Sequence, residues 1–163
     1  PTFFNLLGPL CNPARVTRQV MGVFSAEYLT PVAEAAAALG KTDMLVLHSD
    51  DGLDEISLAA PTSARLLRGG RVEHLTLTPE DAGIALQSLN AAAGGDAAEN
   101  ARIIRAVFEN PEGAAADMVA LNAGAALWVA DRAQNLEDGY LQAIDTLKNA
   151  RAQNMLSRMR KQT

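Results

Sequence analysis

The stretch that decides the fold runs from Arg18 to Leu47 and reads RQVMGVFSAEYLTPVAEAAAALGKTDMLVL. Its first part, Arg18–Phe24, is rich in β-forming residues and predicts a short strand. Its last part, Met44–Leu47, is a continuous apolar run, which is typical of a strand covered on both faces. The alanine-rich segment between them predicts a helix that begins after Ser25 or after Thr30, the two candidate caps. Strand, helix and strand together form a βαβ unit, so we expect a parallel pair of strands in an α/β fold.

A β-hairpin is expected next along the chain. Ala64–Leu67 and Arg71–Leu77 are two short β-rich runs that flank Gly69-Gly70, and glycine takes a positive φ at both central turn positions without strain. Ile56–Leu58 predicts a further brief strand, and Thr78-Pro79 has the cap and the first-turn proline that begin a helix. The sheet is therefore expected to be mixed.

From Asp96 onward the chain is predicted to be almost wholly helical. Four helices are expected, over residues 96–109, 114–130, 136–149 and 151–161. The second is apolar on nearly every face, so we expect it to be central and buried. The third has one apolar face, which consists of Leu136, Tyr140, Leu141, Ile144 and Leu147. The expected fold class is α/β, with a mixed sheet, a β-hairpin and a C-terminal helical layer.

Composition excludes several classes of protein. The chain has 163 residues, a formal net charge of −5 and a pI near 5.0, which argues against binding to nucleic acid or to an anionic membrane surface. The most apolar helical stretch contains Asp117 and Asn122, so no membrane span is expected. The single cysteine, Cys11, excludes an intramolecular disulfide and a cysteine-rich zinc site. Carboxylates remain as metal ligands, and they favour Mg²⁺ or Mn²⁺.

The acidic stretch HSDDGLDE, residues 48–55, is the strongest candidate site. It follows the apolar strand directly, at the carboxyl end where open α/β sheets bind ligands. Gly52 allows the backbone to fold so that Asp54 and Glu55 converge on one ion. Spacing alone leaves two alternatives open: a Mg²⁺-binding loop, or a solvated acidic loop in which the preceding aspartates stabilise a turn.

Other polar residues have plainer interpretations. His48 ends a buried strand and Asn122 lies within the buried helix, so both are expected to make structural hydrogen bonds rather than ligand contacts. Cys11 is expected to be a small buried apolar residue, because no histidine lies near it in sequence. Gly94-Gly95 is expected to be a linker that leads into an Asp96 helix cap, rather than a phosphate-binding turn.

Several motifs resemble those of the anthranilate phosphoribosyltransferases. FNLLGPL at 4–10, followed by Asn12-Pro13, resembles the family's FNLLGPLxNP segment, and DGLDE at 51–55 resembles its magnesium motif. Three further matches follow in the family's order: TPED at 78–81, ENA at 99–101 and LNA at 121–123. The similarity covers essentially the whole chain. It resembles the C-terminal half of the family's protein, the later part of an α/β domain of the nucleoside-phosphorylase/phosphoribosyltransferase type.

The resemblance implies an enzyme of tryptophan biosynthesis. Phosphoribose would be transferred from phosphoribosyl pyrophosphate (PRPP) to the amine of anthranilate, with release of pyrophosphate. Two Mg²⁺ ions would bind the diphosphate, with Glu55 as a ligand of both ions and Asp54 as a ligand of one. The resemblance also implies a cytoplasmic homodimer, formed through a helical domain. From the composition, no nucleic-acid or membrane partner is expected.

Residues 1–163 are expected to form only part of the catalytic α/β domain. The family's helical domain, its glycine-rich phosphate loop and its anthranilate-binding arginine would lie before Pro1. No catalytic or substrate-binding residue is therefore assigned here, and the chain alone is expected to be inactive. Two alternatives stay open: a pyrimidine nucleoside phosphorylase relative, which matches the motifs less well, and a non-catalytic transferase-like protein that binds nucleic acid, which the low pI disfavours.

Overall fold

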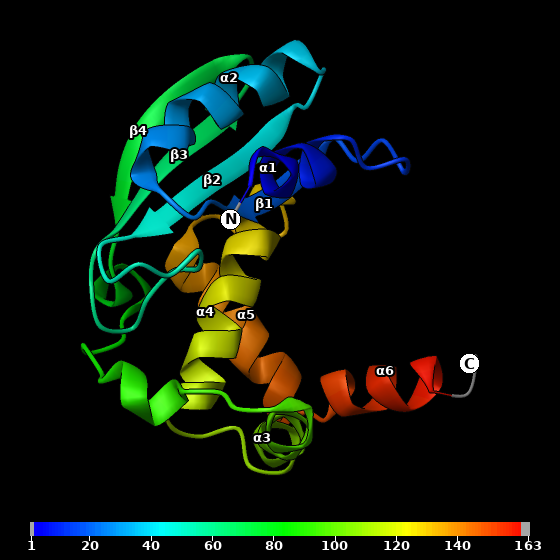
Figure 1. The fold of residues 1–163 in the computed structure, drawn as a ribbon. Helices are drawn as coiled ribbons and strands as arrows, with labels where there is room; N and C mark the ends of the chain where they lie inside the picture. Colours follow the sequence, from blue (N-terminus) through cyan, green and yellow to red (C-terminus); the bar gives the residue numbers. More distant parts are fainter. Residues whose placement is uncertain (1, 161–163) are drawn as a thin grey trace.

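The first half of the chain forms a four-stranded mixed sheet (Figure 1). The structure is a computed structural model that describes residues 2–160. The strands are β1 (Arg18–Gly22), β2 (Asp43–Ser49), β3 (Thr62–Arg68) and β4 (Arg71–Leu77), and they lie side by side in that order. β1 pairs parallel with β2, whereas β2–β3 and β3–β4 are antiparallel. The expected α/β class and mixed sheet are confirmed.

Six α-helices accompany the sheet within the described residues. They are α1 (Phe3–Leu10), α2 (Leu29–Ala38), α3 (Ala97–Glu109), α4 (Ala114–Val129), α5 (Leu136–Lys148) and α6 (Arg151–Met159), with the short 3-10 helices η1 (Ala26–Tyr28), η2 (Pro79–Ala82) and η3 (Leu89–Ala92). The sequence therefore predicted the four C-terminal helices with nearly correct bounds. Among residues 2–160, no helix combines the length and the apolar character needed to cross a membrane.

The hairpin turn forms where it was expected. Gly69 and Gly70 join β3 to β4 with φ of +56° and +76°, between the paired residues Arg68 and Arg71. Side chains with a Cβ rarely adopt this conformation at two successive positions, so the glycine pair determines where the chain reverses.

Helices cover both faces of the sheet because the residues of β2 alternate between two cores. Met44 and Val46 pack with α1 and α2 on one face. Leu45 and Leu47 pack with α4 on the other. All four side chains are at most 1% exposed, which confirms that the apolar run is a strand buried on both faces.

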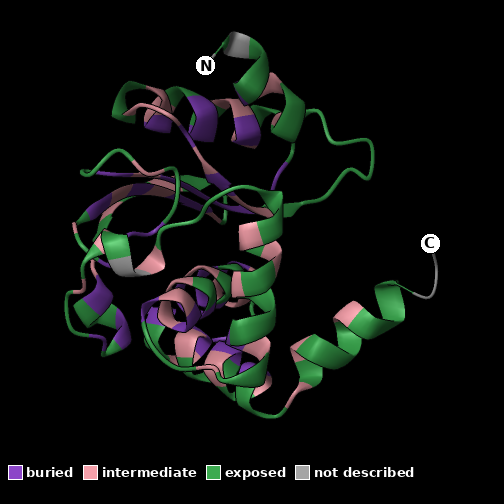
Figure 2. Ribbon diagram, turned by 60° about the horizontal axis from the view of Figure 1, so that its bottom comes forward, coloured by how far each residue is buried: buried purple, intermediate pink, exposed green. Residues whose placement is uncertain are grey.

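α4 and α5 cross at direct backbone contact. A Cβ on Gly124 would lie 2.5 Å from the backbone nitrogen of Tyr140, and a Cβ on Gly139 would lie 2.3 Å from the carbonyl oxygen of Gly124. Figure 2 shows buried residues gathered in the sheet region and among the C-terminal helices, whereas α6 has no buried residue. Close packing against α5 on one side and the sheet on the other makes α4 the central helix, as predicted.

Paired charges attach the C-terminal end of α4 to the sheet. Arg18 on β1 donates to the carboxylate of Asp131 at 2.6 Å and to the carbonyl of Ala130 at 2.6 Å. Asp43, which is 8% exposed, lies 3.5 Å from the Arg18 guanidinium and 3.3 Å from that of Arg68. These contacts fix the position of α4 relative to β1 and β2.

Two predicted elements differ from the structure. Ile56–Leu58 is fully buried but forms no strand, because two of its N–H groups donate to side chains instead of to a neighbouring strand: Ile56 N–H to Asn122, and Ser57 N–H to Thr62. Thr78-Pro79 begins only the single turn η2. Gly83, with φ of +73°, ends that turn at once.

Details of two helices also differ. α2 begins at Leu29, between the two candidate caps, because the 3-10 turn η1 follows Ser25 directly and the α-helix continues from it before Thr30. On α5, Leu141 is 54% exposed, although its apolar character placed it on the packing face. The close approach at Gly139 turns that helix so that Gly139 and Ala143 face the core instead.

Candidate metal site

The acidic loop leaves β2 and turns back sharply. The N–H of Gly52 donates to the carbonyl of Ser49 at 2.9 Å, and the N–H of Ser49 donates to the carbonyl of Leu53 at 2.9 Å. Gly52 adopts φ of +91°, a conformation that glycine takes at no steric cost. The loop is therefore a defined turn at the carboxyl end of a buried strand, as the sequence predicted.

Asp51 stabilises this turn. Its carboxylate accepts hydrogen bonds from the Ser57 hydroxyl and from the N–H of Leu53. Burial raises the pKa of Asp51, but the hydrogen bonds from Ser57, Ser49 and the Leu53 backbone outweigh that effect and hold its pKa below the usual range. The turn-stabilising alternative thus describes Asp51 well.

Asp54 and Glu55 have a different environment. Both are exposed, and within residues 2–160 neither carboxylate forms a hydrogen bond or an ion pair. Glu55 lines a pocket of about 360 Å³ together with Asn90, Gly94 and Met118. The two side chains are thus adjacent, ionisable and available to a ligand.

Two contacts from distant parts of the chain hold the backbone of this loop. Gly22 at the end of β1 packs against the Asp54 carbonyl so closely that a Cβ there would lie 1.7 Å from the Asp54 oxygen. On the other side, the Asn122 side chain of α4 binds both backbone groups of Ile56, at 2.9 Å and 3.1 Å. Gly22 was not predicted as part of the site, although a glycine within a strand is a signal of close backbone approach.

The structural hydrogen bonds expected for His48 and Asn122 and the helix cap expected for Asp96 are present. His48 makes a hydrogen bond through Nδ1 to the Val23 carbonyl at 2.8 Å. Asn122 makes only structural hydrogen bonds among the described residues. Asp96 caps α3 by accepting from the N–H of Glu99 at 2.9 Å.

The Gly94-Gly95 segment is a linker, as expected. The N–H of Gly95 donates to the Asn100 side-chain oxygen at 2.8 Å, and the Asn100 side-chain amide donates to the Gly95 carbonyl at 3.0 Å. A backbone that is already paired with the following helix offers no free N–H at Gly95 for an anion.

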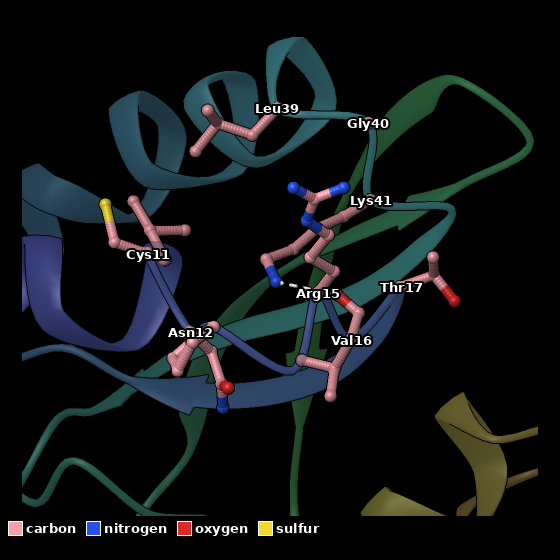
Figure 3. Close-up of a pocket in the computed structure, with 10 residues that line it drawn as sticks. Cys11, Asn12, Arg15, Val16, Thr17, Leu39, Gly40 and Lys41 are labelled. Atoms are coloured by element: carbon pink, nitrogen blue, oxygen red, sulfur yellow. Dashed lines mark hydrogen bonds between the residues drawn. The ribbon is translucent and has the colours of Figure 1, made fainter.

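The expectation for Cys11 is wrong, because Cys11 is exposed. α1 ends just before it, and the chain then loops outward to form one wall of a pocket of about 570 Å³. Figure 3 shows Arg15 and Lys41 at this pocket, where the Lys41 ammonium donates to the Val16 carbonyl at 3.0 Å. No carboxylate or histidine lines it, so nothing there would act as a base toward the thiol.

The described residues contain no group of three or more histidine, cysteine, aspartate or glutamate side chains arranged to hold a metal. A metal at this loop would therefore have two protein carboxylates and would take its other ligands from water or from a bound anion. Mg²⁺ bound together with a phosphate group is usually held in this way.

Comparisons of the sequence with known proteins match this chain to one family and to relatives that share one name. Residues 1–153 match the family described as "Glycosyl transferase family, a/b domain". The chain is 46% identical over 158 residues to the anthranilate phosphoribosyltransferase of Nitrobacter hamburgensis, covering 97% of this chain and 47% of that protein. It is also 46% identical over 158 residues to that of Rubrobacter xylanophilus, covering 96% and 46%.

Solved structures give the same result for the fold. The Thermus thermophilus anthranilate phosphoribosyltransferase superposes with a TM-score of 0.84 at 40% identity, covering 97% of this chain and 46% of that one. The Saccharomyces cerevisiae anthranilate phosphoribosyltransferase in complex with PRPP and Mg superposes with a TM-score of 0.83 at 26% identity, covering 96% and 46%. The chain thus spans about half the length of the relatives that it matches.

Proposed function

Because the chain belongs to the glycosyl transferase family, α/β domain, we propose that it forms the metal-binding part of an anthranilate phosphoribosyltransferase. The observation that carries the proposal is the pair of unpartnered carboxylates, Asp54 and Glu55, on a loop held firmly at the carboxyl end of β2. Relatives that are 46% identical are named for this activity. The transferase rather than the phosphorylase is therefore our conclusion.

The residues present fit Mg²⁺. Asp54 and Glu55 supply hard, anionic oxygen donors, and Asp51 beside them is already bound by Ser57. Two carboxylates leave most of an octahedral coordination sphere to water and to a diphosphate, which is how Mg²⁺ commonly binds in phosphoryl and pyrophosphoryl sites. We assign Asp54 and Glu55 as the Mg²⁺ ligands.

In the proposed reaction, the bond between the anomeric carbon of PRPP and the pyrophosphate oxygen breaks, and a bond from that carbon to the anthranilate nitrogen forms. The nitrogen loses a proton to water, and pyrophosphate leaves with the electron pair of the broken bond. Bound Mg²⁺ would supply electrostatic stabilisation of the leaving group. Asp54 and Glu55 would hold the ions in place, and the contacts of Gly22 and Asn122 hold the backbone that carries the two carboxylates.

The remaining parts of the proposed site would come from the part of the relatives that this chain does not match. That part would bind the ribose phosphates and orient anthranilate against the anomeric carbon, and orientation is worth several orders of magnitude in rate. We also propose that the protein acts in the cytoplasm as a homodimer that forms through a helical domain.

The test is the double variant Asp54→Asn with Glu55→Gln, made in a protein that has the full length of the relatives. We expect turnover of anthranilate with PRPP and Mg²⁺ to fall by two orders of magnitude or more (~10²-fold), with an unchanged circular dichroism spectrum. Loss of stimulation by Mg²⁺ should accompany the loss of turnover. Unchanged turnover at saturating Mg²⁺ would refute the assignment. Activity of the unmodified protein on pyrimidine nucleoside and phosphate instead would support the phosphorylase.

A further inference from the structure

We propose that Asn122 is a positioning residue for Asp54 and Glu55. Its side chain would fix where the two carboxylates lie relative to the body of the protein, and so set their affinity for metal. This inference rests on the proposed metal site. Asn122 lies on α4, whereas the carboxylates follow β2, and the two segments lie close together in the fold (Figure 1).

The contact is two-sided. Oδ1 of Asn122 accepts from the N–H of Ile56 at 2.9 Å, and Nδ2 donates to the carbonyl of Ile56 at 3.1 Å. The side-chain amide thus pairs with both backbone groups of the residue directly after Glu55, as a neighbouring strand would. Nδ2 also donates to the Met118 carbonyl at 3.1 Å, one turn earlier on α4. The orientation of the amide is therefore fixed by its own helix.

The hydrogen bonds within the turn do not attach it to α4, and the N–H of Gln87 binds the carbonyl of Leu58, two residues beyond Ile56. The contacts of Asp51 with Ser57 and Leu53, and of Ser49 with Leu53, join residues that are close in sequence. They shape the turn, but they would move with it. Asn122 is 66 residues away from Ile56, so its contact attaches the turn to a distant helix.

The helix that carries Asn122 is a rigid support. Its neighbour Leu121 is 0% exposed, and Ile56 on the loop is also 0% exposed. Met118, one turn from Asn122, lines the same pocket as Glu55. The backbone that follows Glu55 and the helix are therefore held in one arrangement, to which the Asn122 side chain contributes two hydrogen bonds.

A metal site depends on such outer contacts. Residues that orient a metal ligand without touching the metal typically account for about 10–100-fold in metal affinity. A merely structural hydrogen bond would instead affect the stability of the fold and leave the metal affinity of the folded protein unchanged. The two roles are thus distinguished by measuring both quantities on the same variant.

The experiment uses the full-length protein, with Mn²⁺ as a spectroscopic probe and inorganic pyrophosphate present. Electron paramagnetic resonance gives the dissociation constant of Mn²⁺, and thermal unfolding gives the stability. For Asn122→Ala we expect Mn²⁺ binding to weaken about tenfold or more. Asn122→Asp keeps an acceptor for the Ile56 N–H but cannot donate to the Ile56 carbonyl, so we expect it to weaken binding as well.

Tyr140→Phe is the matched control. It removes a hydrogen bond of 2.7 Å from Tyr140 to Asp117 on the same helix, α4, without touching the acidic loop. We expect it to lower the unfolding temperature and to leave the Mn²⁺ affinity unchanged. Asp54→Asn with Glu55→Gln serves as the reference for loss of the site.

The outcomes separate the two proposals. If the Asp54/Glu55 double variant retains Mn²⁺ binding, the metal site is wrong, and the role of Asn122 is wrong with it. If the double variant loses binding, but Asn122→Ala binds Mn²⁺ like the unmodified protein, Asn122 is only structural and the inference is overturned. Should Asn122→Ala fail to fold, Asn122→Asp decides by the same comparison.

Discussion

At the residue scale, two uncharged residues place the charged ones. Gly22 allows the carbonyl of Asp54 to pack against β1, and Asn122 binds the backbone of Ile56. The carboxylates themselves make no contact that would hold them among the described residues. The position of the proposed site is therefore set by backbone contacts, and the charges remain available for a ligand.

The first prediction concerns Gly22→Ala. The new Cβ would lie 1.7 Å from the Asp54 carbonyl oxygen, so the loop must shift away from β1. We expect a loss of about 1–3 kcal/mol in the free energy of unfolding, as for other overpacked sites, together with weaker metal binding. Chemical denaturation and Mn²⁺ titration measure the two effects. Gly8→Ala is the control for adding a methyl group without a clash, because a Cβ on Gly8 would meet no heavy atom within 4 Å. It should leave metal binding unchanged.

The second prediction concerns the ionisation of Tyr140. Burial, together with the hydrogen bond to the Asp117 carboxylate, raises its pKa to about 12 from 10.0. Because the pKa of Tyr140 is higher in the folded state, the protonated side chain stabilises the fold fully below pH 10. This stabilisation is lost as the pH rises through about 12. The ¹³C NMR shift of the tyrosine ring against pH measures the titration, and the signal must be absent in Tyr140→Phe. A midpoint near 10 would contradict the prediction.

At the element scale, α4 connects the site to two hydrophobic cores. Leu121 and Val129 contribute to the core beneath the sheet, whereas Ala116 and Ala120 pack with α3 and α5. Its surface is not buried all round, since Val119 is 46% exposed. The apolar sequence of α4 therefore reflects several packing surfaces plus one open face.

The third prediction is that Leu121→Ala destabilises the fold by about 2–5 kcal/mol, because this side chain is 0% exposed in a close-packed core. Leu141→Ala on α5 is the matched control. Leu141 is 54% exposed, so its truncation should change stability by no more than about 0.5 kcal/mol. Equilibrium denaturation compares the two variants, and equal losses would show that the packing of α4 and α5 is described wrongly.

At the scale of the whole molecule, the chain presents a largely apolar groove between its C-terminal helices. The groove measures about 430 Å³ and is lined mainly by Phe108, Val119, Ala123, Ala126, Leu127 and Leu147.

Since the chain spans about half the length of its relatives, the proposed activity needs residues that lie outside it.

The fourth prediction follows from that. Residues 1–163 produced alone should not transfer phosphoribose to anthranilate, because two metal ligands cannot orient either substrate. The assay measures consumption of anthranilate with PRPP and Mg²⁺, and activity should return when the remaining part is supplied as a separate polypeptide. Turnover of the isolated chain within about tenfold of a full-length relative would mean that the catalytic groups lie within these residues, because the loss of positioning alone should cost far more.

By itself, the sequence determined the four strands of the sheet, the hairpin and the C-terminal helices. These elements follow from local properties, because each signal determines the conformation of the residues next to it. The signals are the apolar run Met44–Leu47, the glycine pair Gly69-Gly70 and the cap at Asp96. The acidic loop was also identified from its own residues, because a cluster of carboxylates after a buried strand is visible in sequence.

Only the tertiary structure decided which residues hold that loop and which side chains stay free. Gly22 and Asn122 meet Asp54 and Ile56 across the fold, and periodicity carries no information about such contacts. The same reason explains the buried loop Ile56–Leu58 that was predicted as a strand, and the exposed Cys11 that was predicted to be buried. Burial and hydrogen-bond partners depend on what packs against a segment, and that partner is supplied by residues far away in the chain.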